Sequence, residues 1–251
     1  PGPLTIVLKK ASIVPKIVNA GLDTVAIRMP SNEIALSLIR ESKVPLAAPS
    51  ANLSTRPSPT CAEHVINDLY GMIDAIIDGG ETTIGVESSV IDLTTTPTTL
   101  LRPGGVTFEE LQAVLGKNNI RKLTFKPRHG SLTPKSPGMK YRHYSPKAAV
   151  FLVEGNTSNV EPKVQEIAAK HMRQGYKVGI MTINEAHQYE ADKIKFMGRD
   201  LETIARNIFK TFRTFDKEDM DVIIMEGVKE EQLGLAIMNR IRKAAKKTIR
   251  V

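Results

Sequence analysis

The second half of the chain has the clearest alternation of apolar and polar segments. Apolar runs read AAVFLVEG, KVGIMTI, DKIKFMG and DVIIMEGV, and stretches with helical spacing at 160–173 and 201–212 lie between them. A last stretch, GLAIMNRIRKAAKK, repeats apolar side chains at helical intervals. Strands that alternate with helices are typical of a parallel, doubly wound sheet. We therefore expect residues 148–251 to form an α/β domain around such a sheet.

The first half is less regular but also predicts a sheet. Short apolar runs that end at polar residues or glycine mark strand candidates at 4–8, 24–30, 46–48, 74–80, 90–93 and 99–102. Helical spacing predicts one helix over 31–42, and capping-box patterns predict two more, from Thr60 with Glu63 and from Thr107 with Glu110. This mixture indicates an α/β or α+β domain over residues 1–116.

The stretch 45–58, PLAAPSANLSTRPS, changes abruptly from apolar to polar. We expect Leu46–Ala48 to form a buried strand that ends in a rigid loop. Ligands bind at the carboxyl ends of strands in open α/β sheets, and compact donors and acceptors suit such a site. The loop offers four of them: Ser50, Asn52, Ser54 and Ser58. The simplest alternative is a surface loop rich in proline and serine.

Charge is distributed unevenly along the chain. The formal charges of residues 1–116, 117–147 and 148–251 are −4, +9 and +3, which make up the total of +8. The middle segment contains no acidic residue, so it could contact nucleic acid, a polyphosphate or an acidic face of its own protein. Its four prolines and two glycines equally fit a solvated linker.

Composition and missing motifs exclude several classes of protein. The single cysteine, Cys61, cannot form an internal disulfide, and no apolar run has the roughly 18 residues that a membrane span needs. We therefore expect a cytoplasmic protein that does not bind membranes. Neither GxGxxG nor GxxxxGK[ST] follows any predicted strand, so dinucleotide and P-loop binding lack support.

Six motifs occur together in one order. They are PGPLT at 1–5, TVAIRMP at 24–30, APSAN at 48–52, ESSVIDL at 87–93, LLRPG at 100–104 and SPGMKYRHYSP at 136–146. In this combination the chain resembles the threonylcarbamoyl-AMP synthases of the long type. The resemblance implies a YrdC-like twisted mixed-sheet domain over 1–116, partly missing at its N-terminus. A linker over 117–147 and a Rossmann-like parallel-sheet α/β domain of Sua type over 148–251 would follow.

The resemblance also implies an activity. Members of the family act as nucleotidyltransferases that convert L-threonine, bicarbonate and ATP, with Mg2+ bound to the ATP, into L-threonylcarbamoyladenylate and pyrophosphate. The product is used by the t6A transferase machinery for t6A37 modification of ANN-decoding tRNAs. No covalent nucleophile and no resident metal site is expected in this reaction.

Site residues carry over from the family pattern one by one. A guanidinium such as that of Arg28 suits the carboxylate of a free amino acid, and the pattern adds Ala48, through its backbone, and Ser88 to the threonine site. For ATP it implies Thr24, Ser50, Ser58, Arg102 and Tyr144, and we add Asn52 as a neighbour on the same loop. The linker resembles a lid over the site, with Tyr141, Arg142 and His143 as further lid candidates next to Tyr144.

Two family motifs do not occur in this chain. These are a threonine-binding PT(D/E)TVYGL segment and a KxR pair that holds phosphates. We therefore expect these 251 residues alone to form little threonylcarbamoyl-adenylate, and the completed protein to form it.

Two alternatives stay open at this point. The chain could be an RNA-binding module, or a subunit that recruits partners of the tRNA modification machinery through residues 148–251. Direct contact with tRNA, the oligomeric state and the ligand of the C-terminal domain are not decided by the sequence.

Overall fold

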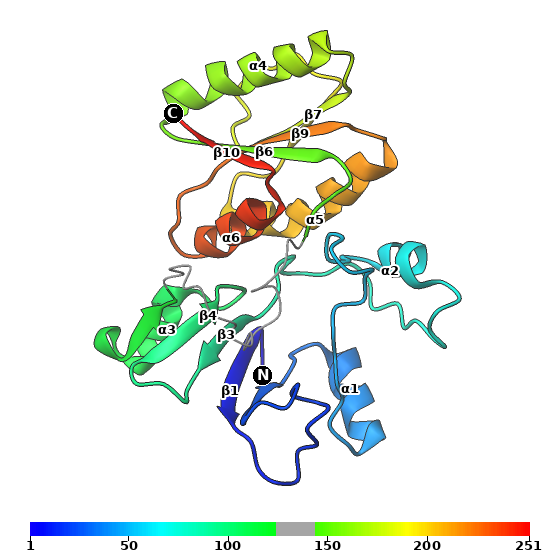
Figure 1. Cartoon of the computed structure of the whole chain (residues 1–251), viewed down its shortest axis with the longest axis vertical. Helices are drawn as coiled ribbons and strands as arrows, with labels where there is room; N and C mark the ends of the chain where they lie inside the picture. Colours follow the sequence, from blue (N-terminus) through cyan, green and yellow to red (C-terminus); the bar gives the residue numbers. More distant parts are fainter. Residues whose placement is uncertain (124–143) are drawn as a thin grey trace. The chain divides into compact units, whose positions relative to one another are not determined.

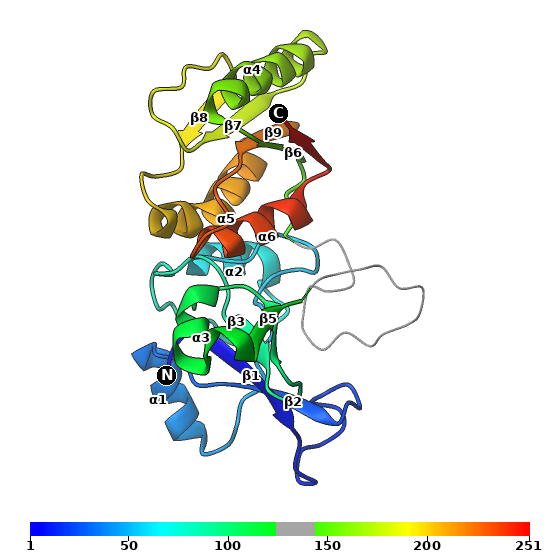
Figure 2. The same cartoon turned by 90° about the vertical axis from the view of Figure 1, so that its left-hand side faces the viewer.

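The computed structural model describes residues 1–123 and 144–251 of the chain. The described residues form two compact units, which consist of Pro1–Pro49 with 86–123 and of Ser50–Gly85 with 144–251. We refer to these as the first and the second unit, and Figures 1 and 2 show the elements of each from perpendicular directions. The domain boundaries expected at residues 116 and 147 stay predictions.

The first unit contains a five-stranded mixed sheet. In spatial order its strands are β2 (Thr24–Arg28), β1 (Leu4–Lys9), β3 (Ser89–Asp92), β4 (Thr98–Arg102) and β5 (Ile120–Lys122). β1 is antiparallel to β2 and parallel to β3, while β4 is antiparallel to β3 and parallel to β5. All of β3 is buried, whereas the last three residues of the edge strand β2 are exposed. The buried part of this sheet therefore lies on β3 and the neighbouring β4.

Side chains cap the N-termini of the helices α1 and α3 in the first unit. α1 (Glu33–Ser42) starts after Asn32, whose Oδ1 accepts a hydrogen bond of 3.0 Å from the amide of Ala35. α3 (Phe108–Leu115) is followed by the short 3₁₀ turn η1 (Lys117–Asn119). The capping box predicted for α3 is confirmed, because Thr107 Oγ1 accepts from Glu110 N at 3.2 Å and Glu110 Oε2 accepts from Thr107 N at 2.7 Å.

Two of the predicted strands are wrong. Residues 46–48 and 74–80 are not in strands, and Leu46 and Ile77 are 43% and 61% exposed. An apolar run becomes a strand only when a neighbouring strand supplies backbone hydrogen-bond partners. Neither run has such a neighbour among residues 1–123 and 144–251. The polar loop that starts at Ser50 thus follows an exposed irregular segment and not a buried strand.

The capping box predicted at Thr60 is also wrong. α2 is Ala62–Leu69, and Cys61 occupies the N-cap position without a side-chain cap bond. Instead, the amide of Thr60 donates to His64 Nδ1 at 3.1 Å. Burial, together with the nearby positive charge of Arg213, lowers the pKa of His64, so this ring nitrogen stays an acceptor at neutral pH.

The second unit contains the expected parallel sheet. In spatial order its strands are β10 (Lys247–Arg250), β6 (Ala149–Glu154), β9 (Val222–Glu226), β7 (Val178–Thr182) and β8 (Lys193–Phe196). All neighbouring pairs are parallel, which confirms the prediction. α4 (Thr157–Arg173) covers one face of the sheet, and α5 (Leu201–Lys217) and α6 (Gly234–Ala244) cover the opposite face (Figures 1 and 2). The sequence analysis did not include β10, which forms one edge.

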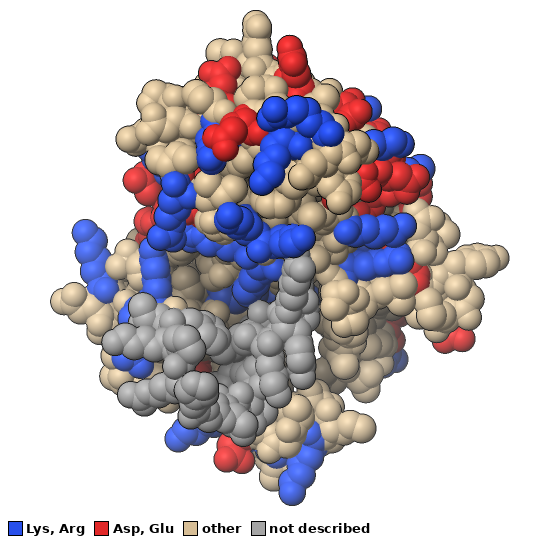
Figure 3. Space-filling model, turned by 45° about the horizontal axis from the view of Figure 1, so that its top comes forward, with Lys and Arg blue, Asp and Glu red and all other residues tan. Residues whose placement is uncertain are grey.

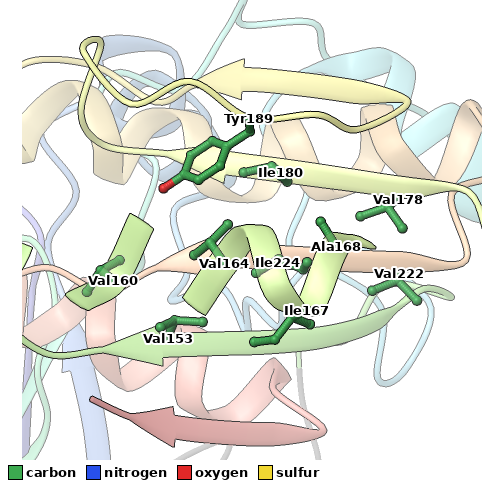
Figure 4. Close-up of a cluster of buried hydrophobic side chains, with 10 residues drawn as sticks. All are labelled: Val153, Val160, Val164, Ile167, Ala168, Val178, Ile180, Tyr189, Val222 and Ile224. Carbon is green, nitrogen blue, oxygen red and sulfur yellow. The ribbon is translucent and has the colours of Figure 1, made fainter. Parts of the chain in front are cut away.

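The central strands of this sheet are buried on both faces. β7 and β9 have no exposed residue, as expected for near-continuous apolar runs in a parallel sheet. Side chains of β6, β7 and β9 meet the apolar stripe of α4 in one cluster, which Figure 4 shows. Because side chains alternate along a strand, Ile223 and Met225 point to the other face, where α5 and α6 lie.

One carboxylate is buried at the carboxyl end of the parallel sheet. Glu226, 1% exposed at the end of β9, accepts hydrogen bonds from Thr182 Oγ1 at 3.0 Å and from the amide of Ile183 at 2.7 Å. His187 Nδ1 lies 2.7 Å from its other oxygen, and the Tyr189 hydroxyl donates to that oxygen as well. Burial and the contact with Glu226 raise the pKa of Tyr189. These hydrogen bonds replace those to water that the carboxylate of Glu226 loses on burial.

No helix in the described part of the chain combines the length and apolar character needed to cross a bilayer.

Removing apolar volume from β9 should destabilise the protein strongly. Ile224 is fully buried, whereas Ile194 in the edge strand β8 is 42% exposed. We expect Ile224→Ala to lower the free energy of unfolding by about 2–5 kcal/mol and Ile194→Ala by less than about 1 kcal/mol. Urea unfolding followed by circular dichroism measures both values, and equal losses would contradict the burial described above.

Candidate functional site

Three residues predicted from the sequence meet around one hydroxyl group in the first unit. Arg28 ends the edge strand β2, Ser88 directly precedes β3, and Arg102 ends β4. Although they are separated by 60 and 14 positions in the chain, the sheet order β2-β1-β3-β4 brings them to the same end of neighbouring strands. This convergence depends on the pairing of β1 with both β2 and β3.

Ser88 is the centre of this group. Its Oγ lies 3.3 Å from Arg28 Nη1, 3.2 Å from Arg102 Nη2 and 2.7 Å from Thr5 Oγ1. The carbonyl of Ser88 accepts from Arg102 Nε at 3.1 Å and from Arg102 Nη2 at 2.9 Å. Ser88 and Arg102 are buried, whereas Arg28 is exposed. The site therefore combines one immobilised guanidinium with one that can reach a ligand from solvent.

The loop after β4 holds the backbone around Ser88 in place. Gly105 N donates to the carbonyl of Glu87 at 3.0 Å, and the hydroxyl of Ser89 donates to the carbonyl of Val106. Gly104 lies so close that a Cβ there would be 2.2 Å from Glu87 O and 2.4 Å from the carbonyl carbon of Ser88. Only glycine permits this approach, which explains the motif LLRPG in physical terms.

The other two predicted residues of the first unit lie outside these contacts. Thr24 begins β2, four residues before Arg28, so the two positions are about 13 Å apart along the strand. Its carbonyl accepts from Asn19 Nδ2 at 2.9 Å. Ala48 lies exposed in the irregular segment before Ser50. Thr5 belongs to the Ser88 group but was not identified from the sequence, although it stands in the motif PGPLT.

The second unit holds the polar loop with Ser50, Asn52 and Ser58. Asn52 Nδ2 donates to the carbonyls of Leu53 at 2.8 Å and Arg56 at 3.3 Å, so this side chain closes the loop on itself. Ser50 is exposed, whereas Ser58 is buried. Two further residues bond to this loop and were not predicted from the sequence, Asp68 of α2 and Arg213 of α5. A carboxylate in the sequence of an amphipathic helix gives no sign of such a role.

Tyr144 is buried in the second unit. Its ring centroid lies 5.4 Å from that of Phe209, and the guanidinium carbon of Arg240 lies 5.5 Å from the ring centroid. The backbone of Tyr144 has φ of 68°, an uncommon value for a residue with a side chain. The other lid candidates, Tyr141, Arg142 and His143, lie outside the described residues.

Within the two described ranges, no group of three or more His, Cys, Asp and Glu side chains could hold a metal ion. On the face drawn in Figure 3, Lys and Arg side chains gather in a band below a region of mixed charge.

Family models match both parts of the chain. One described as "Threonylcarbamoyl-AMP synthase, C-terminal domain" matches residues 106–246, and one described as "Telomere recombination" matches residues 1–104.

Similar proteins extend beyond the length of this chain. It is 53% identical to the threonylcarbamoyl-AMP synthase of Pyrococcus abyssi, over 98% of this chain and 71% of that protein. The corresponding protein of Bacillus subtilis is 47% identical, over 98% of this chain and 70% of its own length. A solved structure, "Crystal structure of P. abyssi Sua5 complexed with L-threonine", has a TM-score of 0.91 at 52% identity and covers 100% of this chain and 73% of that chain.

Adding a methyl group at Gly104 should disturb the Ser88 group. We expect Gly104→Ala to lower the free energy of unfolding by about 1–3 kcal/mol, because the backbone of Glu87 and Ser88 must move. Gly227→Ala is the control, since the nearest atoms to a Cβ there are 3.2–3.4 Å away and include the flexible end of Met238. Urea unfolding compares the two variants. A Gly104→Ala protein as stable as the control would refute the close packing described here.

Proposed function

Because this chain belongs to the threonylcarbamoyl-AMP synthase family, we propose that the Ser88 group binds the L-threonine from which the enzyme forms threonylcarbamoyl-AMP. The observation that supports this proposal is that Arg28 and Arg102 both donate hydrogen bonds to the hydroxyl of Ser88. A free amino acid needs a cation for its carboxylate and a polar partner close by, and this group supplies both.

Arg28 is the residue proposed to hold the threonine carboxylate. Its guanidinium is exposed but already oriented by the bond to Ser88 Oγ, so a carboxylate can bind without displacing a buried partner. The planar fork of an arginine matches a carboxylate with two parallel hydrogen bonds. Ser88 would contribute its hydroxyl and Ala48 its backbone.

ATP is the second proposed substrate, and six residues are assigned to it. In the first unit these are Thr24 and Arg102, and in the second Ser50, Asn52, Ser58 and Tyr144. Arg102 is held by two hydrogen bonds to the carbonyl of Ser88, so its charge would not need to reorient during the reaction. Preorganised cations of this kind stabilise the negative charge that spreads over the phosphate in the transition state.

The proposed reaction balances without a covalent enzyme intermediate. The amino group of threonine takes up bicarbonate with loss of water, which yields a carbamate. A carbamate oxygen then forms a bond to the α-phosphorus of ATP, and the bond from that phosphorus to the bridging oxygen of pyrophosphate breaks. Mg2+ is proposed to enter as part of the ATP substrate and to offset charge on its phosphates. The protein's share is to orient the reactants and hold cations close to them.

Threonine-dependent release of pyrophosphate tests the proposed function. The chain is incubated with ATP, Mg2+ and bicarbonate, with and without L-threonine, both as it stands and with the family's PT(D/E)TVYGL and KxR segment added before Pro1. We expect threonine to stimulate release strongly in the extended form and weakly in the chain as it stands. Release that does not depend on threonine in either form would identify a general ATPase and refute the assignment.

Replacing Arg28 should affect threonine more than ATP. Arg28→Ala removes the proposed partner of the carboxylate, and we expect the KM for threonine to rise by about tenfold or more, while the KM for ATP changes by less than about twofold. Arg40→Ala is the matched control, since Arg40 is another arginine of the first unit and lies on α1. An unchanged KM for threonine in Arg28→Ala would remove Arg28 from the site.

A further inference from the structure

One helix of the second unit contacts both segments that carry its proposed ATP residues. α5 packs its apolar side chains into the core, and its polar side chains face the loop before α2 and the segment that starts at Tyr144. Gly85 also touches this helix, since a Cβ there would lie 2.2 Å from the Cα of Arg206. The sequence places these three segments about 60 to 150 positions away from α5.

Arg213 makes the most complete contact of this helix with the loop. Its Nε and Nη2 donate to the carbonyl of Pro57 at 3.1 and 2.6 Å, and Nη1 and Nη2 donate to the two carboxylate oxygens of Asp68 at 3.3 and 2.7 Å. The side chain of Arg213 is only 10% exposed and that of Asp68 is fully buried. Pro57 directly precedes Ser58, so the carbonyl that Arg213 holds fixes the peptide that leads into a proposed ATP residue.

Asp68 connects the same arginine to the other end of the loop. Its carboxylate accepts from the amide of Leu53 at 3.3 Å and from Arg56 Nη1 at 2.9 Å, and Leu53 directly follows Asn52. Burial opposes ionisation of Asp68, but the hydrogen bonds from Arg213 and Arg56 outweigh it and lower the pKa of the carboxyl. Asp68 is therefore charged at neutral pH and can hold both ends of the loop through charge-assisted bonds.

The segment that begins at Tyr144 is held by neighbouring positions on α5. Phe209 lies against the ring of Tyr144, and Asp216 Oδ1 accepts from the amide of Lys147 at 2.8 Å. Phe209, Arg213 and Asp216 are four and three residues apart, so they share one face of the helix. The amide of Ser145 also donates to the carbonyl of Thr55 at 2.9 Å, which joins this segment to the loop directly.

The geometry points to Arg213 as a positioning residue for ATP: with Asp68 it sets the backbone of Leu53–Ser58 and thereby the placement of Asn52 and Ser58. In this role Arg213 acts through the loop, by its bonds to Pro57 and Asp68. The inference rests on the function proposed above, and it gives α5 of the C-terminal part a specific task in the reaction. Misplacing binding groups by about 1 Å is enough to cost up to a hundredfold in rate.

Kinetics of Arg213 variants test this role. We expect Arg213→Ala to raise the KM for ATP by about tenfold, with less than about a twofold change in the KM for threonine, in the form that releases pyrophosphate. Arg213→Lys should fall between the wild type and the alanine variant, because an ammonium keeps the charge beside Asp68 but cannot form both pairs of bonds. This graded order is not expected if Arg213 only contributes to stability.

Lys217→Ala is the matched control. Lys217 also joins α5 to α2, through Glu63 at 3.1 Å, but this pair is exposed and does not touch the loop. We expect both KM values to stay unchanged in this variant. Amide hydrogen exchange of Leu53–Ser58 should be faster in Arg213→Ala than in Lys217→Ala, since the loop loses its anchor.

The possible outcomes separate the two proposals. If the unaltered protein shows threonine-dependent release and Arg213→Ala keeps its KM for ATP, the positioning role is overturned while the proposed function stands. If Arg213→Ala does not fold, a folded Arg213→Lys variant with an unchanged KM for ATP overturns the positioning role instead. If neither form of the unaltered protein shows threonine-dependent release, the proposed function fails, and the role of Arg213 in ATP binding fails with it.

Discussion

The second unit depends on the burial of one side of α5. Ile208, Phe212 and Phe215 are all but completely buried, and Gly179 of β7 leaves room for the ring of Phe215, which a Cβ there would approach to 2.6 Å. This packing fixes the rotation of the helix about its own axis. Once the apolar side is fixed, Arg213 and Asp216 must point toward the segments that they bind. The same helix thus provides apolar contacts for the core and charged contacts for two distant parts of the chain.

Three buried charged side chains, those of Asp68, Glu226 and Arg102, are each stabilised by several hydrogen bonds. Asp68 is surrounded by two guanidinium groups and a backbone amide, and Glu226 accepts from hydroxyls, an amide and the ring of a histidine. An unpaired charge in either position would cost several kcal/mol. Arg102 follows the same rule in the first unit, where the carbonyl and hydroxyl of Ser88 receive its donors. In each case the hydrogen bonds that replace water also hold the charged side chain in one orientation.

Patterns along the chain predicted most of the regular structure but failed where a run lacked a partner. Four of the five described strands of the parallel sheet and the capping box of α3 were recognisable because their signals are local or repeat with the period of the element. DAIIDGG and PLAA carry the same apolar signal as the true strands, yet they are exposed because no described strand pairs with them. At Thr60 the capping-box pattern also failed, since His64 takes the contact expected for Glu63. A local pattern cannot show which hydrogen-bond donors and acceptors will be taken by another residue.

By itself, the sequence determined the family, the order of a mixed-sheet part and a parallel-sheet part, and the identity of Arg28, Ser88 and Arg102 as residues of interest. The family and the three residues follow from the resemblance that the six ordered motifs carry. Hydrophobic period indicates the strands and helices of the parallel sheet, because it is a property of neighbouring positions. Only the tertiary structure decided that these three residues share one hydroxyl, that Thr5 joins them, and that Arg213 holds a loop about 155 positions earlier in the chain. Such contacts follow from strand order and helix rotation, which are set by packing across the whole unit and leave no periodic mark in the sequence.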